Sequence, residues 1–212
     1  MIKNGLIRGT NVPLSKVTKC DSCILGKQTR TPIPKKREEG PGHKATRKLE
    51  KVWVDLAGPH PVQSQSKNEY TMDIIDDYTD MAWSIPLKTK DQAFDELVAW
   101  ERRVETESGL KVGIYNIDNG ELKSDRMRDY LRERGTTQRF TSPYTSAHNG
   151  RVERLHRTLM AKARTMRIYA RCPTNLWDEF YLTALYLHTR TAIGTIKDST
   201  PFERWYERKP DY

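Results

Sequence analysis

Three carboxylates of the sequence stand where strands and helices are expected to end or begin. Asp55 interrupts the apolar run VWVDLAG, Asp118 closes KVGIYNID before an Asn-Gly turn, and Glu153 falls in the first turn of a helix. Carboxylates that converge repel one another unless a cation lies between them, and all-oxygen sites suit Mg²⁺ or Mn²⁺. Two such ions about 3.5–4 Å apart can activate an attacking oxygen and stabilise the leaving one at phosphorus. The three acids therefore predict metal-dependent chemistry on a phosphodiester.

Each acid also has an ordinary structural explanation. An aspartate at a strand end commonly belongs to a turn, and a glutamate at a helix N-terminus is favoured by the helix dipole. Asp55 is the hardest of the three to explain in this way, because an acid between Val54 and Leu56 in a buried strand needs a partner.

The helix that carries Glu153 is strongly basic. Residues 139–171 contain eight Lys or Arg residues and a single acid. Arginine pairs with phosphate in a bidentate way, so arginines in line with Glu153 predict a phosphate track that leads away from a metal site. The alternative is a solvated basic surface. On a helical wheel, one stripe contains Glu153, Arg157, Met160 and Arg164, and the opposite, core-facing arc contains Val152, Leu155, His156, Leu159, Ala163 and Met166.

The composition narrows the class of protein. A net charge of +9 and a pI near 9.4 favour an acidic partner, most often nucleic acid. The sequence has no apolar run of membrane-spanning length and no signal peptide at its start. Three cysteines, an odd number, fit a reducing compartment better than a disulfide framework. We therefore expect a soluble intracellular protein.

The periodicity predicts an α/β fold with a mixed sheet and helices on both faces. A capping box at Thr89 and Gln92 begins a helix that Gly109 ends, and a shorter helix runs from Ser124 to Gly135. A helix after Pro173 has an apolar face of Leu176, Trp177, Phe180, Tyr181, Ala184 and Leu187. The strands are expected at 50–58, 70–79, 81–89, 111–118 and 137–142, and a loop at 142–149 precedes the long helix at 150–170.

Three regions follow from this pattern. Residues 1–48 are rich in proline, glycine and basic residues and form a basic arm or linker. Residues 49–170 form the core, and residues 171–212 form a helical extension. The tryptophans Trp53, Trp83, Trp100 and Trp177 lie in elements that are expected to be buried, so we interpret them as core residues.

At this point several segments resemble a known family. VWVDLAGP, IIDDYTDMAWSIPLKTK, NIDNGEL and QRFTSPYTSAHNGRVERLHRTL are similar to the integrase core of Ty1/copia-type retrotransposons, in the retroviral integrase superfamily. Upstream, CDSCILGKQTRTP resembles the pre-integrase region of the same polyproteins. Downstream, LWDEFYLTALYLHTRTAIG and TPFERWYERKPDY resemble the segment that follows the core.

This resemblance implies an RNase H-like fold with a five-stranded mixed sheet, and a D,D,E polynucleotidyl transferase. The triad falls on Asp55, Asp118 and Glu153, which would bind Mg²⁺ or Mn²⁺, two ions in all. The reaction implied joins the 3′-hydroxyl of element cDNA to target DNA, and water in place of the hydroxyl gives end trimming. Gly150 would be the hinge of the loop at 142–149. The residues implied in DNA binding are Tyr144, His148, Asn149, Arg151, Arg154, Arg157 and Arg164.

The partners implied are element cDNA ends and target DNA, with RNA as an alternative partner, and a further copy of the chain in a homo-oligomer. The place of action implied is the nucleus, after assembly in a cytoplasmic particle. No membrane is expected to take part.

The sequence also departs from the family. Asp118 and Glu153 enclose 34 residues, one fewer than the family's usual 35. Cys20 and Cys23 supply half of a tetrahedral zinc site, and His43 has no partner at the expected spacing, so we predict that the chain binds no zinc.

Two other functions compete with an integrase. The chain could be an inactive remnant that still binds nucleic acid, or another nuclease of the same fold, such as a ribonuclease H or a Holliday-junction resolvase. The stretch SPYTSAHNGRVER argues against the latter.

Overall fold

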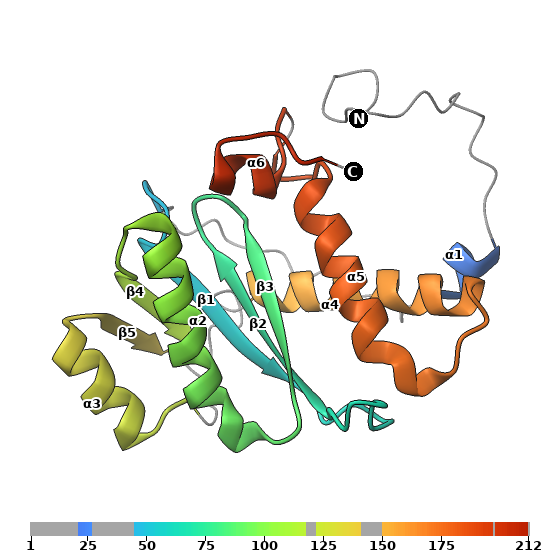
Figure 1. Cartoon of the computed structure of the whole chain (residues 1–212), viewed down its shortest axis with the longest axis horizontal. Helices are drawn as coiled ribbons and strands as arrows, with labels where there is room; N and C mark the ends of the chain where they lie inside the picture. Colours follow the sequence, from blue (N-terminus) through green and yellow to red (C-terminus); the bar gives the residue numbers. More distant parts are fainter. Residues whose placement is uncertain (1–20, 27–44, 118–121, 141–149, 197, 212) are drawn as a thin grey trace, which may run out of the picture.

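The computed structural model describes residues 21–26, 45–117, 122–140, 150–196 and 198–211 (Figure 1). A five-stranded mixed sheet forms its centre, with the strand order β3-β2-β1-β4-β5. β1 pairs antiparallel with β2 and parallel with β4. β3 pairs antiparallel with β2, and β5 pairs parallel with β4. The fold class predicted from the sequence is therefore confirmed. The strands are β1 (Lys51–Ala57), β2 (Tyr70–Asp76), β3 (Ala82–Leu87), β4 (Ile114–Ile117) and β5 (Thr137–Phe140).

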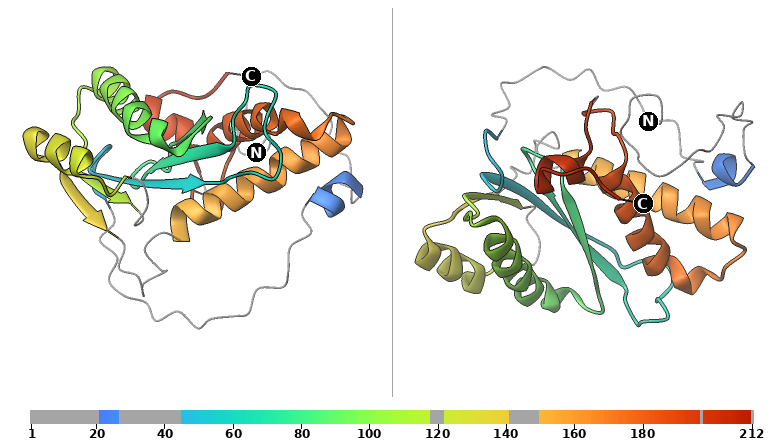
Figure 2. Two further views of the ribbon diagram at one scale, coloured as in Figure 1. Left: turned by 90° about the horizontal axis from the view of Figure 1, so that it is seen from below. Right: turned by 45° about the horizontal axis from the view of Figure 1, so that its top comes forward.

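Helices cover both faces of the sheet. α2 lies over one face, and α4 and α5 lie side by side over the other (Figure 2). The helices are α1 (Asp21–Gly26), α2 (Ala93–Ser108), α3 (Asp125–Arg134), α4 (Gly150–Tyr169), α5 (Trp177–Arg190) and α6 (Pro201–Tyr206), and the short 3₁₀ turns are η2 (Lys90–Gln92) and η3 (Thr174–Leu176).

The local signals in the sequence set several helix boundaries. The Gln92 side chain accepts hydrogen bonds from the backbone N–H groups of Lys88 and Thr89, at the start of η2. The Ser124 hydroxyl caps α3 by accepting a hydrogen bond from a backbone N–H three residues on. Gly109 and Gly135 both take the left-handed conformation that ends a helix, each with φ of 68°. The predicted ends of α2 and α3 are confirmed.

The alternation of β1 places its side chains in two different cores. Val52 and Val54 are fully buried in the cluster between the sheet and α2. Trp53 points to the opposite face and packs against the cluster formed by α4 and α5. Asp55 has the parity of Trp53, so it also faces α4 and not the α2 core. This alternation explains how an acid fits into an apolar strand.

α5 belongs to the core beneath α4. Trp177, Tyr181 and Ala184 are buried in the same cluster as Ile75 of β2. The predicted apolar face is wrong at Leu187, which is 37% exposed, whereas His188 is 9% exposed. Positions 177, 181, 184 and 188 of α5 are buried and follow the helical repeat. The next buried position after 184 is therefore 188 and not 187.

The tryptophans lie in the core as expected, to different depths. Trp100 and Trp177 are buried, and Trp53 and Trp83 are half-buried. Trp83 makes edge contacts with both Trp100 and Trp205, so α6 closes one end of the α2 side of the core.

Within the predicted basic arm, α1 is a short helix that packs against α4. Gly26 at its end lies so close to Thr165 of α4 that a Cβ there would meet the threonine backbone at 2.8 Å. The division into the regions 1–48, 49–170 and 171–212 remains a prediction. None of the helices in the described part of the chain has the length and apolar character needed to cross a membrane.

Candidate active site

Asp55 and Glu153 line the same cavity, which we call the carboxylate cavity. Asp55 comes from the middle of β1 and is half-buried, and Glu153 comes from the first turn of α4 and is exposed. The cavity has a volume of about 410 Å³. Its lining consists of Gly26, Asp55, Glu153, His156, Arg157, Met160, Ala161 and Arg164. The stripe read from the helical wheel, from Glu153 to Arg164, therefore faces this cavity.

Packing of the opposite side of α4 fixes the direction of this stripe. Val152, Leu155 and Leu159 are 0%, 5% and 0% exposed and lie in the core cluster with α5. With this side of the helix buried, Glu153 and the arginines of the stripe are left toward the open side.

The donors of this cavity fit a hard divalent cation. Asp55 and Glu153 offer carboxylate oxygens, which Mg²⁺ and Mn²⁺ prefer. Ile117, the last residue of β4, pairs with Val54, the neighbour of Asp55. The third predicted acid, Asp118, lies outside the described residues. Within the described residues no three His, Cys, Asp or Glu side chains converge as a metal site, so the cation remains a prediction.

A buried network behind the cavity was not anticipated from the sequence. Asp73 is 1% exposed and pairs across the sheet with Asp55. Its carboxylate accepts hydrogen bonds from Ser84 and from the Tyr181 hydroxyl, the latter at 2.6 Å, and lies 2.9 Å from His156 Nδ1. Burial, reinforced by the Asp73 charge, raises the pKa of Tyr181, so this hydroxyl stays protonated and donates.

This network brings His156 to the cavity, although the helical wheel assigns it to the core-facing arc. The ring is half-buried, and its Nδ1 lies 2.9 Å from both Asp73 and Tyr181. The signal that could have found the network is the parity of Asp55 and Asp73 on neighbouring antiparallel strands. No sequence signal linked Tyr181 to Asp73, because a tyrosine on the apolar face of a helix is normally interpreted as a core residue.

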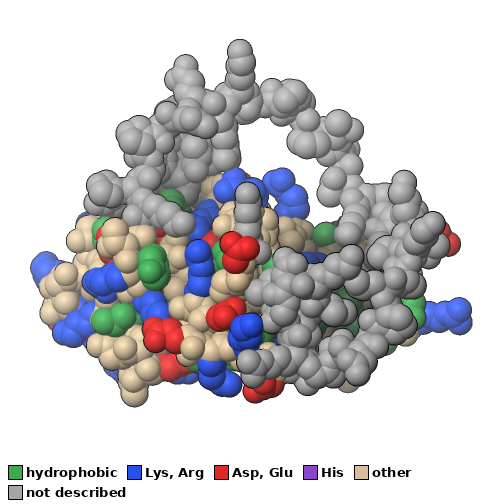
Figure 3. Space-filling model, turned by 90° about the horizontal axis from the view of Figure 1, so that it is seen from above, with side chains coloured by type: hydrophobic (Ala, Val, Ile, Leu, Met, Phe, Trp, Pro, Cys, Tyr) green, Lys and Arg blue, Asp and Glu red, His purple; other side chains and the backbone are tan. Residues whose placement is uncertain are grey.

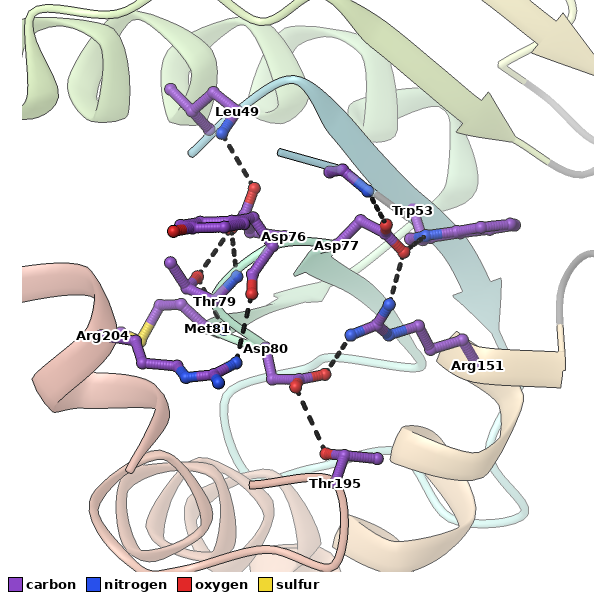
Figure 4. Close-up of polar contacts among 12 residues, drawn as sticks. Leu49, Trp53, Asp76, Asp77, Thr79, Asp80, Met81, Arg151, Thr195 and Arg204 are labelled. Carbon is purple, nitrogen blue, oxygen red and sulfur yellow. Dashed lines mark hydrogen bonds and ion pairs between the residues drawn. The ribbon is translucent and has the colours of Figure 1, made fainter. Parts of the chain in front are cut away.

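Arg151 is placed differently from the other predicted DNA-binding arginines. Its guanidinium is ion-paired with both Asp77 and Asp80, and it does not line the cavity (Figure 4). These two carboxyl groups are only 6% and 5% exposed. The contact ties the first turn of α4 to the turn between β2 and β3, so the structure gives Arg151 a packing role.

The turn that holds Arg151 satisfies all of its acids. We call Asp76, Asp77 and Asp80 the acidic turn. Every one of its six carboxylate oxygens accepts at least one hydrogen bond, several of which Figure 4 shows. The donors are backbone N–H groups and the side chains of Trp53, Thr79, Arg151 and Thr195.

The remaining predicted binding residues fall into three groups. Arg157 and Arg164 are exposed in the carboxylate cavity. Arg154 is exposed on another side of α4, in a cavity that Arg151 also lines. The loop residues Tyr144, His148 and Asn149 lie outside the described residues.

The described residues do not test the prediction that the chain binds no zinc. Cys20 and His43 lie outside the described residues, and Cys23 falls within α1. The absence of zinc therefore stays a prediction.

On the one face that Figure 3 shows, the basic side chains of the described residues are spread out rather than gathered at one place. On the face shown in Figure 3, Lys and Arg side chains lie interspersed with Asp and Glu in the described part of the chain. The net charge of +9 alone therefore does not mark a binding surface on this face. Arg157 and Arg164 are distinguished by sharing a cavity with the carboxylates of Asp55 and Glu153.

Known proteins give this geometry a family context. No protein-family model matches the chain. Over 197 residues, 92% of the chain, it is 33% identical to the retrovirus-related Pol polyprotein from transposon TNT 1-94 of Nicotiana tabacum. It is 26% identical over its full length to the Pol polyprotein from transposon RE2 of Arabidopsis thaliana. It is also 25% identical, over 74% of the chain, to the transposon Ty1-NL2 Gag-Pol polyprotein of Saccharomyces cerevisiae.

The chain spans only 14%, 14% and 9% of these relatives' own lengths. Among solved structures, the fold is similar to a chain of the simian T-cell lymphotropic virus intasome in complex with PP2A regulatory subunit B56 gamma. The TM-score is 0.63 at 14% identity, over 88% of this chain and 63% of the other. The chain therefore belongs with the Ty1/copia-type, retrovirus-related Pol polyproteins, and it shares its fold with the intasome chain.

Proposed function

We propose that this chain is the catalytic core of a retrotransposon integrase that joins element cDNA to target DNA. One observation carries the proposal: Asp55 from β1 and Glu153 from α4, far apart in sequence, open into one cavity with two arginines. If Asp55 and Glu153 had only local structural roles, nothing would require their side chains to line the same cavity. The related Pol polyproteins supply the second support.

In this proposal Asp55, Asp118 and Glu153 are the ligands of two Mg²⁺ or Mn²⁺ ions. Asp118 directly follows Ile117, whose strand partner is the residue before Asp55. A bound cation pair would neutralise the carboxylates and activate the attacking oxygen. The same site would trim cDNA ends when water replaces the hydroxyl.

The described side chains have separate tasks. Arg157 and Arg164 bind successive phosphates that lead away from the reacting one and hold the strand along α4. Asp73 and Tyr181 hold the His156 ring against the cavity wall. The 3′-oxygen attacks phosphorus, a new P–O bond forms, and the bond to the departing 3′-oxygen breaks. The proton lost by the attacking hydroxyl leaves to solvent, and the departing oxygen takes one up.

We further infer that the partners are element cDNA ends and target DNA, and that the chain acts as a homo-oligomer in the nucleus. Since the curated relatives are several times longer than this chain, these inferences concern the region and not a whole polyprotein.

Strand transfer tests the proposal directly. Labelled duplexes with the element's terminal sequence are incubated with the chain and Mn²⁺, and wild type is compared with Glu153→Gln and Arg132→Gln. We expect joined product with wild type and with the exposed α3 control Arg132→Gln, and none with Glu153→Gln.

Product from Glu153→Gln at the wild-type level would refute the role of that residue. If no variant gives product but all bind DNA in a salt-sensitive manner, the inactive remnant becomes the better description.

A further inference from the structure

A second cavity adjoins the carboxylate cavity. It has a volume of about 210 Å³ and shares Met160 and Arg164 with the first. Its wall is mostly apolar, unlike the charged lining of its neighbour. We call it the apolar pocket; its lining residues are His60, Pro61, Val62, Met160, Ala163, Arg164, Arg167, Thr174 and Trp177.

A row of flat rings connects the two cavities. The ring centroids of Trp177 and His60 lie 4.0 Å apart, and those of His60 and His156 lie 6.0 Å apart with the planes at 24°. Trp177 and His60 line the apolar pocket, whereas His156 lines the carboxylate cavity. Burial, together with the nearby His156, lowers the pKa of His60 to about 4, so this ring is uncharged at neutral pH.

Arginine marks the junction of the two cavities. Arg164 is exposed and lines both of them. Arg167, one helical turn along in the same pocket, donates to the carbonyl of Cys172 at 2.9 Å. A ligand that matches both features has a flat, uncharged part for the pocket and an anionic group for Arg164.

We propose that the apolar pocket holds one unpaired nucleobase of a DNA end, whose adjoining phosphate contacts Arg164. The inference rests on the proposed function, since the base belongs to the DNA strand whose phosphate would react in the adjoining cavity. Stacking on aromatic side chains next to a basic track is the usual way in which proteins bind unpaired bases. A paired base cannot enter, because it would have to leave its own stack.

The test compares matched duplexes that end either blunt or in one unpaired nucleotide. The unpaired residue is adenine or an abasic site, on the 3′ or the 5′ strand, and affinity is measured by fluorescence anisotropy. We expect the unpaired adenine to bind at least about fivefold more tightly than the blunt end. The duplex with an abasic unpaired nucleotide should lose this gain in affinity. Comparison of the duplexes unpaired on the 3′ strand with those unpaired on the 5′ strand identifies the strand whose base enters the pocket. An unpaired 2-aminopurine should be quenched on binding.

A matched pair of variants locates the effect. Val62, 39% exposed, lies in the wall of the pocket, so Val62→Trp should fill it. Leu187, 37% exposed, lies on α5 outside the lining of the pocket and serves as the control in Leu187→Trp. We expect Val62→Trp to abolish the preference while its affinity for blunt duplex is unchanged, and Leu187→Trp to keep both.

Each other result overturns the proposal. Equal affinity of the wild type for adenine, abasic and blunt ends would exclude a base pocket and leave the integrase proposal standing. A preference that survives in folded Val62→Trp would place the base elsewhere. Failure to bind any of the duplexes would remove both proposals. If Val62→Trp does not fold, the abasic and 2-aminopurine measurements on the wild type still decide.

Discussion

The first turn of α4 lies between two sets of acids that differ in their surroundings. Arg151 and Glu153 are two residues apart, so their side chains point about 200° away from each other around the helix. Arg151 reaches into the acidic turn, where every carboxylate oxygen has a donor from the protein. Glu153 reaches the carboxylate cavity, where it is exposed to solvent.

The contrast separates the acids of a packed turn from the two acids that we propose to be functional. In the acidic turn, the protein itself supplies a cation and the hydrogen bonds that offset the cost of burial. Burial still raises the pKa of Asp76, against the opposing effect of its hydrogen bonds from Thr79. In the cavity, Asp55 and Glu153 come from different elements and share open space, which leaves room for a ligand. Four experiments test this distinction.

The largest expected effect is on the acidic turn. Arg151→Ala would leave two buried carboxylates without their cation, and we expect the free energy of unfolding to fall by about 3–5 kcal/mol. Denaturant unfolding measures this. The control is Arg132→Ala, which removes an exposed ion pair with Asp129 and should cost less than about 1 kcal/mol. Equal losses in the two variants would mean that the acidic turn is no special anchor.

The next effect concerns the cavity. Mg²⁺ or Mn²⁺ at about 100 times its dissociation constant should stabilise the wild type by about 2.7 kcal/mol. The melting temperature should rise accordingly in wild type and not in Asp118→Asn or Glu153→Gln. Asp91→Asn, an exposed acid at η2, should keep the gain. A gain that persists in both site variants would mean that the cation binds elsewhere.

A pH titration examines the neighbourhood of the acidic turn. Burial, with Lys162 nearby, lowers the pKa of His188 to about 4 from an ordinary 6.5, against an opposing effect of Asp80. The unfolded chain therefore binds more protons between these values, and stability is lost as pH falls from 6.5 towards 4. We expect His188→Gln to flatten this decline by on the order of 1–2 kcal/mol, measured by unfolding at pH 7 and pH 4.5. An unchanged decline would show that His188 titrates normally.

The smallest effect concerns the proposed phosphate track of Arg157 and Arg164. Arg164→Gln should weaken DNA binding for every duplex sequence and lower the slope of log affinity against log salt by about one. Arg132→Gln on α3 should leave that slope unchanged. A slope that Arg164→Gln does not alter would remove this arginine from the track.

Much of the fold follows from local sequence. Gly109 and Gly135 determine where α2 and α3 end, and the cap at Ser124 determines where α3 begins, since caps satisfy the free backbone groups of a helix. Strand alternation predicts that Asp55 faces away from Val52 and Val54. The helical repeat predicts the stripe from Glu153 to Arg164. Each of these needs only the period of a strand or helix and the chemistry of its ends.

Which partner each charged group has depends on the tertiary packing and not on the local sequence. By composition, Arg151 and Arg157 are alike on one basic helix. Arg151 is ion-paired with the buried Asp77 and Asp80, and Arg157 lines the cavity, because the β2–β3 turn packs on the side of α4 that carries Arg151. Likewise, Tyr181 reaches Asp73 across 108 residues of sequence. Local patterns set the direction of a side chain, but its partner depends on which distant segment packs against it.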